Sequence, residues 1–190
     1  MTRNRNPRIL GTVDDVARAW GLEDRLAGAA TIGYAYGECV RCTVETTRRA
    51  KVLAGAAHTE ERRIVLNAEL LRRGREASRN ATLLHECAHV LADLRYRADC
   101  RHDRRWKRVM AMLGEPPEIS HRLDFLSHET HAVVSWICVG CGEEFHYVRP
   151  PRRPIEVCYC PRCGPEAGRL RNAEIPRRRK GSRAVQLRLF

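Results

Sequence analysis

The chain has 190 residues, of which 43% are hydrophobic and 31% charged, and this ordinary composition excludes an intrinsically disordered protein. No apolar run approaches the ~18 residues that cross a bilayer, and the N-terminal MTRNRNPRIL lacks the apolar core of a signal peptide, so we expect a cytosolic protein. The net charge of +12 and the pI of about 9.8 favour polyanionic partners such as nucleic acid, although an arginine-rich chain can also reflect a GC-rich genome.

The first third of the chain predicts one helix followed by strands. Thr12-Val-Asp-Asp15 is typical of a helix N-terminus, and apolar residues at helical spacing predict a helix over about 12–27. Residues 31–54 and 62–67 are rich in Thr, Val, Tyr and Ile with partial alternation. They predict strands of one small antiparallel sheet.

Two helices and a change of texture follow. Apolar stripes predict helices at about 79–96 and 103–113. After Val134 short alternating stretches are punctuated by Cys, Gly and Pro, and a charged tail follows them. The sequence thus predicts an α+β domain over 1–134, a small cysteine-rich module over 135–170 and a basic flexible tail over 171–190.

The predicted helix at 79–96 contains the sequence HECAH. His85 and His89 are four residues apart, so on a helix they project from one face and reach a single metal ion. Glu86 flanks that face. In zinc hydrolases with this pattern the metal lowers the pKa of a bound water and the glutamate accepts its proton. An amphipathic helix that merely carries two histidines is the plainer alternative, but polar groups in an otherwise apolar helix are costly without a partner.

A third ligand must come from outside this motif. The metzincin pattern needs Gly and His where this chain has Ala92 and Arg95, which excludes that class. Glutamate ligands would be Glu115 or Glu118, in a proline-bounded turn that holds a ligand poorly. His102, at the start of the next helix, is better placed, and Cys100 competes with it. Asp93, one turn beyond His89, is either a partner of the ligands or a solvated carboxylate.

These motifs together resemble the SprT-like (Spartan-related) zinc metallopeptidases. The similarity rests on HExxH, a following His-x-x-x-Trp and a Lys-x-x-Met, at His85, Glu86, His89, His102, Trp106, Lys107 and Met110. The strand before the HExxH helix and the cysteine-rich module after the domain also fit that family's layout. The family usually has Gly after the third histidine, where this chain has Asp103, a good helix N-cap.

The resemblance implies a zincin-like fold, one catalytic zinc ion bound by His85, His89 and His102, and Glu86 as the general base. It further implies substrates that are bound or crosslinked to DNA, single-stranded or with junctions, and hence a cytoplasmic protein associated with the nucleoid. No oxyanion stabiliser follows from the residues.

Two C-x2-C pairs predict a second zinc site. Cys138 and Cys141 are separated from Cys160 and Cys163 by a spacing typical of a structural four-cysteine zinc ribbon. Cys158 is an alternative ligand to Cys160. Cys39 and Cys42 form a further C-x2-C without a second pair nearby, so a chance or core pair in a strand is expected there.

Basic residues and the C-terminal peptide predict partners. Arg149, Arg152 and Arg153 lie in a proline-stiffened loop of the ribbon, where they suit DNA phosphates or form a solvated cluster. The tail carries a further basic run, at Arg177, Arg178, Arg179 and Lys180.

The last five residues, QLRLF, resemble the peptide by which bacterial polymerases and repair proteins bind the β sliding clamp. That resemblance implies a polar contact by Gln186 and insertion of Leu187, Leu189 and Phe190 into an apolar pocket. A last strand that docks on the sheet is the alternative.

The sequence therefore predicts a DNA-associated zinc metallopeptidase. Two rivals stay open: a non-catalytic nucleic-acid-binding zinc protein, and a regulatory protease that cuts one cytosolic protein.

Overall fold

The computed structural model describes residues 7–118 and 123–175. The chain falls into two compact units, Met1–Leu123 and Asp124–Phe190, each of which is described by itself. The sequence predicted a boundary after residue 134, whereas this division lies between Leu123 and Asp124. No helix in the described ranges is long and apolar enough to cross a membrane.

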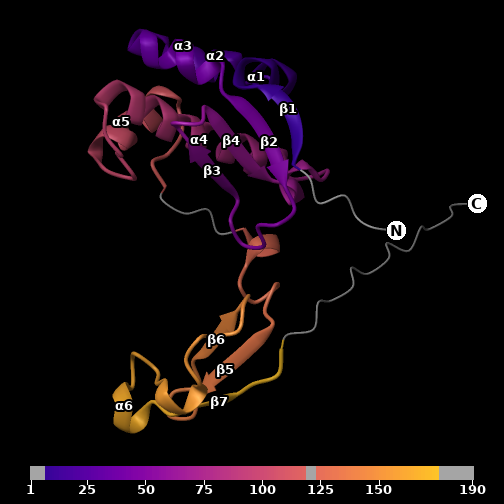
Figure 1. Cartoon of the computed structure of the whole chain (residues 1–190), viewed down its shortest axis with the longest axis vertical. Helices are drawn as coiled ribbons and strands as arrows, with labels where there is room; N and C mark the ends of the chain where they lie inside the picture. Colours follow the sequence, from indigo (N-terminus) through magenta and orange to yellow (C-terminus); the bar gives the residue numbers. More distant parts are fainter. Residues whose placement is uncertain (1–6, 119–122, 176–190) are drawn as a thin grey trace, which may run out of the picture. The chain divides into compact units, whose positions relative to one another are not determined.

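The first unit contains a four-stranded sheet in the order β1-β2-β4-β3 (Figure 1). Its strands are β1 Arg8–Thr12, β2 Thr43–Thr47, β3 Gly55–His58 and β4 Arg63–Asn67. The pairs β1–β2 and β3–β4 are antiparallel, but β2 and β4 are parallel. The predicted antiparallel sheet was therefore wrong. After β2 the chain forms β3 at the outer edge and returns through β4 between them, which makes β4 parallel to β2.

Three short helices connect β1 to β2: α1 Val13–Trp20, α2 Glu23–Ala27 and α3 Tyr34–Val40. Thr12 and Asp15 form the capping box that begins α1. Gly21 ends α1 in a left-handed conformation with φ 66°, so the predicted single helix over 12–27 is two helices. A short 3-10 turn, η1 Ala30–Ile32, precedes α3.

The segment that forms α3 was predicted as strand, and that prediction was wrong. Ala35, Glu38 and Cys39 are buried at the spacing of one helical face, and the strand starts only at Thr43. The β-prone residue types of this segment were outweighed by burial of that helical face.

Two further helices complete the first unit. The 3-10 turn η2 Ala68–Leu71 leads into α4 Glu76–Tyr96, which packs against β3, β4, α3 and α5. The helix α5 Arg104–Met112 follows a short loop. Both helices were predicted, and their apolar stripes are buried, with Leu84, Cys87 and Leu91 fully enclosed on α4. The α+β class is confirmed.

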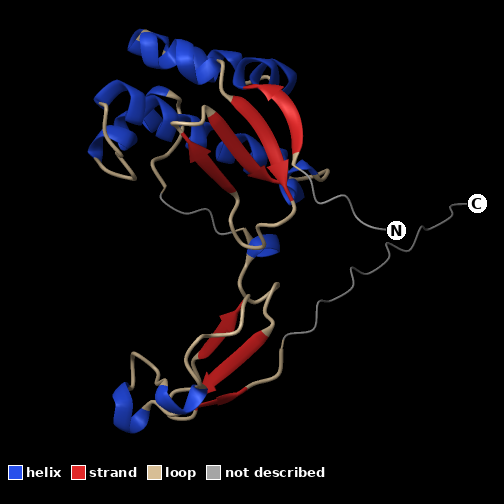
Figure 2. Cartoon of the chain, in the orientation of Figure 1, coloured by secondary structure: helices blue, strands red, loops and turns tan. Residues whose placement is uncertain are grey.

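The second unit has a three-stranded antiparallel sheet in the order β6-β5-β7 (Figure 2). The strands are β5 Val134–Cys138, β6 Glu144–Tyr147 and β7 Leu170–Asn172, and the short helices are η3 Asp124–Leu126, η4 Ile155–Val157 and α6 Gly164–Ala167. Its buried core consists of Trp136, Cys138, Cys160 and Leu170. So small a core rarely holds a fold without a metal or disulfides. Pairing of β7 with β5 carries the ordered module to Asn172.

Candidate metal centres

Three imidazoles of the first unit converge on one point. His85 and His89 lie one turn apart on α4, and His102 lies just before α5. The Nε2 atom of His102 is 3.2 Å from Nε2 of His85 and 3.2 Å from Nε2 of His89. A tetrahedral zinc ion with Zn–N bonds of about 2.0–2.1 Å separates its nitrogen ligands by about 3.3–3.4 Å. The three nitrogens therefore fit one zinc ion.

The surroundings of His89 and His102 favour the neutral, ligating form of their imidazoles. Burial, and then the neighbouring His102, lowers the pKa of His89 to about 4, although Asp93 and Asp99 oppose the shift. Burial also lowers the pKa of His102. Neutral imidazole nitrogens bind metal ions without first losing a proton.

Trp106 packs against all three histidines. Its ring centroid lies 4.9 Å from that of His85, 5.4 Å from that of His89 and 4.7 Å from that of His102. The indole is fully buried, and its Nε1 has no hydrogen-bond partner within the described chain. Trp106 thus acts through ring packing, which restricts how the three imidazoles can turn.

The loop that carries His102 is held by two aspartates. Asp93 Oδ1 accepts a hydrogen bond from the backbone N–H of Cys100 at 2.9 Å, and its Oδ2 accepts one from the Thr59 hydroxyl at 3.1 Å. Asp103 caps α5, because its Oδ1 accepts hydrogen bonds from the backbone N–H groups of Arg105 and Trp106. Asp93 is therefore no solvated carboxylate: it fixes the approach to His102.

The other candidate third ligands lie outside the cluster. Cys100 is buried, and its Sγ is 3.3 Å from the Ala98 carbonyl oxygen. Glu115 forms an ion pair with Arg25 at 2.9 Å. Of the residues that the structure describes, only His102 joins His85 and His89 in a group with metal-binding geometry.

Glu86 follows His85 on α4 and lies against the edge strand β3. It is 7% exposed, and burial raises its pKa to about 8, while a hydrogen bond from the Ala57 backbone N–H opposes the shift. A Cβ atom on Gly55 would lie 2.8 Å from Glu86 Oε1 and 2.9 Å from Thr82 Cγ2. Gly55 therefore lets β3 approach Glu86 closely. Sequence reasoning missed this residue, although a glycine next to β-prone residues is a known sign of close backbone approach.

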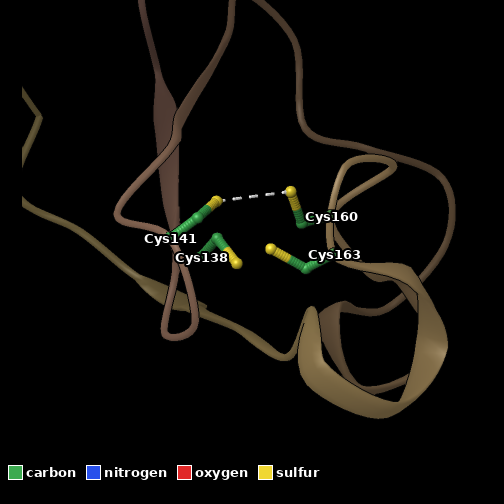
Figure 3. Close-up of side chains that lie close together, drawn as sticks. All are labelled: Cys138, Cys141, Cys160 and Cys163. Atoms are coloured by element: carbon green, nitrogen blue, oxygen red, sulfur yellow. Dashed lines mark hydrogen bonds between the residues drawn. The ribbon is translucent and has the colours of Figure 1, made fainter.

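Four thiols of the second unit form another cluster (Figure 3). The Sγ atoms of Cys138, Cys141, Cys160 and Cys163 lie within 4.8 Å of one another, and those of Cys141 and Cys160 are 3.7 Å apart. A tetrahedral zinc ion with Zn–S bonds of about 2.3 Å separates its sulfurs by about 3.8 Å. The cluster therefore fits a closed zinc site.

Backbone N–H groups stabilise the thiolate of Cys138. Hydrogen bonds from the backbone of Cys141 and then Gly140 lower the pKa of Cys138 to about 7. Cys158, the alternative ligand, lies outside the cluster and packs half-buried against the core of the module. The structure thus places Cys160 in the fourth position.

One protein family and several relatives match part of this chain. Residues 31–131 match the model of the SprT-like family. The chain belongs to this family. It is 30% identical over 117 residues to Protein SprT of Pseudomonas aeruginosa strain UCBPP-PA14, and the same values hold for Protein SprT of strain LESB58. The aligned region covers 58% of this chain and 70% of each relative. No solved structure matches.

Membership of the SprT-like family indicates a metallopeptidase-like function. The matched segment contains the three histidines, Glu86 and Trp106. The four cysteines lie beyond it, so the histidine site belongs to the shared part of this SprT-like chain.

Of the other predicted residues, those that the structure describes lie outside the two metal-binding clusters. Arg149, Arg152 and Arg153 are exposed and form no ion pair with any described residue. Cys39 lies near the C-terminus of α3, and Cys42 follows that helix. Both cysteines are buried, and neither belongs to a metal-binding group among the described residues. The basic tail residues Arg177, Arg178, Arg179 and Lys180 and the terminal residues Gln186, Leu187, Leu189 and Phe190 lie outside the described residues.

Proposed function

We propose that this SprT-like chain is a zinc-dependent endopeptidase that acts on proteins associated with or crosslinked to DNA. The convergence of three imidazole Nε2 atoms, with the buried Glu86 next to His85 in the sequence of the same helix, carries the proposal. The described residues supply three ligands to this group and no fourth, and a zinc site with three protein ligands keeps a position open for water or substrate. This favours an enzyme over a purely structural metal site.

The chemistry divides between the ion and the chain. His85, His89 and His102 would hold a zinc ion, whose Lewis acidity would activate water and polarise a carbonyl group. The positive charge of a bound zinc ion would oppose the rise in the pKa of Glu86 that burial causes. The ionised Glu86 then accepts the proton of the attacking water on a carboxylate oxygen and passes it to the leaving amine nitrogen. The Ala57 N–H holds the carboxylate in place for both transfers.

The strand β3 supplies a place for the substrate backbone. It is the edge strand of the sheet, so its side away from β4 has no strand partner within the described ranges. An extended peptide can pair with that edge, and the contact between Gly55 and Glu86 then brings its backbone next to the carboxylate.

The second unit and the tail supply DNA and partner binding. Cys138, Cys141, Cys160 and Cys163 would hold a zinc ion that stabilises the ribbon. Arg149, Arg152 and Arg153 contact DNA phosphates. The basic run at 177–180 adds salt-dependent attraction to DNA, and residues 186–190 bind the β sliding clamp. Replacing Leu189 and Phe190 by alanine is expected to abolish clamp binding; unchanged affinity would refute the clamp assignment.

The test compares one target protein in two states: crosslinked to a single-stranded oligonucleotide, and free. Faster cleavage of the crosslinked form, with a smaller difference after deletion of residues 171–190, is the expected result. Equal cleavage of both forms, unaffected by the deletion, points instead to a regulatory protease that recognises one protein.

A further inference from the structure

The outer face of α5 carries only positive charge. Trp106, Val109 and Met110 of this helix are buried, which turns Arg104, Lys107 and Arg108 to the exposed side. The helix contains no acidic residue. Arg105 forms an ion pair with Asp103, whereas Arg104, Lys107 and Arg108 have no ion-pair partner in the part of the chain that the structure describes.

This arrangement opposes the stability of the helix. The N-terminus of a helix carries a partial positive charge, and Arg104, Arg105 and Lys107 all lie in its first turn or next to it. Arg104 also faces Lys107 and Arg108 at the i,i+3 and i,i+4 spacings, where like charges repel. Asp103 offsets one of these charges. Folding therefore gives no reason for the other three, which favours a ligand outside the chain.

The basic character continues on the preceding helix end. Arg95 and Arg97 are exposed at the C-terminus of α4, and the guanidinium groups of Arg95 and Arg105 each lie 5.6 Å from the ring of Tyr96. Cations at a helix C-terminus are stabilising, so these two arginines alone would indicate nothing. Arg95 shares the Tyr96 ring with Arg105 and therefore adds positive charge beside the start of α5.

We propose that this face, formed by Arg104, Lys107 and Arg108, binds the phosphate backbone of nucleic acid beside the zinc site. Arg104 follows the zinc ligand candidate His102 by two residues, so DNA on this face lies close to the reacting centre. The inference rests on the proposed function and adds a DNA contact within the first unit, separate from those of the ribbon and the tail.

The chemistry of the face favours nucleic acid over an acidic protein. Protein interfaces have a core of apolar and aromatic side chains with charges at the rim. The exposed face of α5 offers cations from its first turn onward, as interfaces with nucleic acid do.

The experiment uses the full chain and two variants with equal loss of charge. One variant carries Arg104→Gln, Lys107→Gln and Arg108→Gln. The control carries Arg48→Gln, Arg49→Gln and Lys51→Gln, which are exposed loop residues between β2 and β3 and have no ion pair with any described residue. Binding of single-stranded and duplex oligonucleotides is measured by fluorescence anisotropy over a series of salt concentrations.

The α5 variant is expected to lower the slope of log K against log salt by about 2 for single strands and about 3 for duplex, the loss of three phosphate contacts. The control is expected to keep the wild-type slope. An equal fall in both variants would mean nonspecific attraction and overturn the proposal, as would an unchanged α5 variant. Displacement of the DNA by poly-glutamate at equal charge concentration would indicate an acidic protein partner instead.

Two further measurements on the same variants distinguish failure of this inference from failure of the proposed function. Cleavage of DNA-free casein by the α5 variant is expected to equal that of the wild type, because the metal site is intact. Its melting temperature should be equal or higher, since cations are removed from the start of α5, and a lower one would assign the face a structural role. Wild-type protein that cleaves casein but binds no DNA would overturn both the inference and the DNA-directed part of the proposed function.

Discussion

Gly55 and the side chain of Glu86 lie so close together that any side chain at position 55 would collide with Glu86. A Cβ atom at position 55 would lie 2.8 Å from Glu86 Oε1, a separation too short for real contacts. The edge strand and the buried carboxylate are therefore packed as one unit, although they are 31 positions apart in the sequence.

Replacing Gly55 by alanine is expected to displace Glu86 and Thr82 and to lower kcat of peptide cleavage at least about ten-fold, with zinc content unchanged. The matched control is Gly37→Ala in α3, where the nearest atom to an added Cβ is the Arg41 side chain at 3.7 Å. That change is expected to leave kcat unaltered and to stabilise the protein by up to about 1 kcal/mol. Wild-type kcat in Gly55→Ala would show that the contact does not position Glu86.

Asp93 is expected to govern zinc affinity without touching the ion. Asp93→Ala removes the acceptor for the Cys100 N–H and the Thr59 hydroxyl, so the loop before His102 loosens. Zinc affinity of the histidine site should fall about 10–100-fold, measured by competition with a chelator. Asp14→Ala, which removes only an exposed ion pair with Arg18, is the control and should not change it. Equal affinities in both variants would contradict the role assigned to Asp93.

Two substitutions of Trp106 distinguish the contribution of its ring packing from that of its indole N–H. Trp106→Ala should cost about 3–5 kcal/mol in unfolding free energy and weaken zinc binding, because a fully buried ring that contacts three imidazoles is lost. Trp106→Phe should retain most of the stability and the zinc, since the indole Nε1 makes no hydrogen bond to a described residue. A Phe variant as damaged as the Ala variant would mean that the indole nitrogen matters.

The two neighbouring cysteines of the ribbon should behave differently. Cys160→Ser is expected to lose the zinc ion of the four-cysteine site and to unfold the second unit, whose buried core is too small to stand alone. Cys158→Ser should keep the zinc, because its side chain lies outside the cluster. Zinc content by mass spectrometry under native conditions distinguishes the two, and loss of zinc in Cys158→Ser alone would reverse the assignment.

Both metal-binding clusters were predictable, because the ligands of each pair are close together in the sequence. His85 and His89 meet through helix periodicity, and the C-x2-C pairs imply a shared metal by their spacing. The parallel pairing of β2 with β4 was not predictable, because strand order depends on contacts between distant segments. The same applies to Gly55 and Asp93, whose partners are set by how β3 and the loop before α5 pack on α4. The helix α3 was missed because its residue types favour strands while its burial is helical.

The central claim is that this SprT-like chain is a zinc peptidase in which Glu86 transfers the proton. Its most direct test measures zinc content and peptide cleavage together, in the wild type and in Glu86→Gln. The account predicts two zinc ions per chain in both proteins, with cleavage in the wild type and a loss of at least about a thousand-fold in the variant. Cleavage retained by zinc-loaded Glu86→Gln would contradict the role of Glu86, and zinc-loaded wild type that cleaves no substrate would contradict the account as a whole.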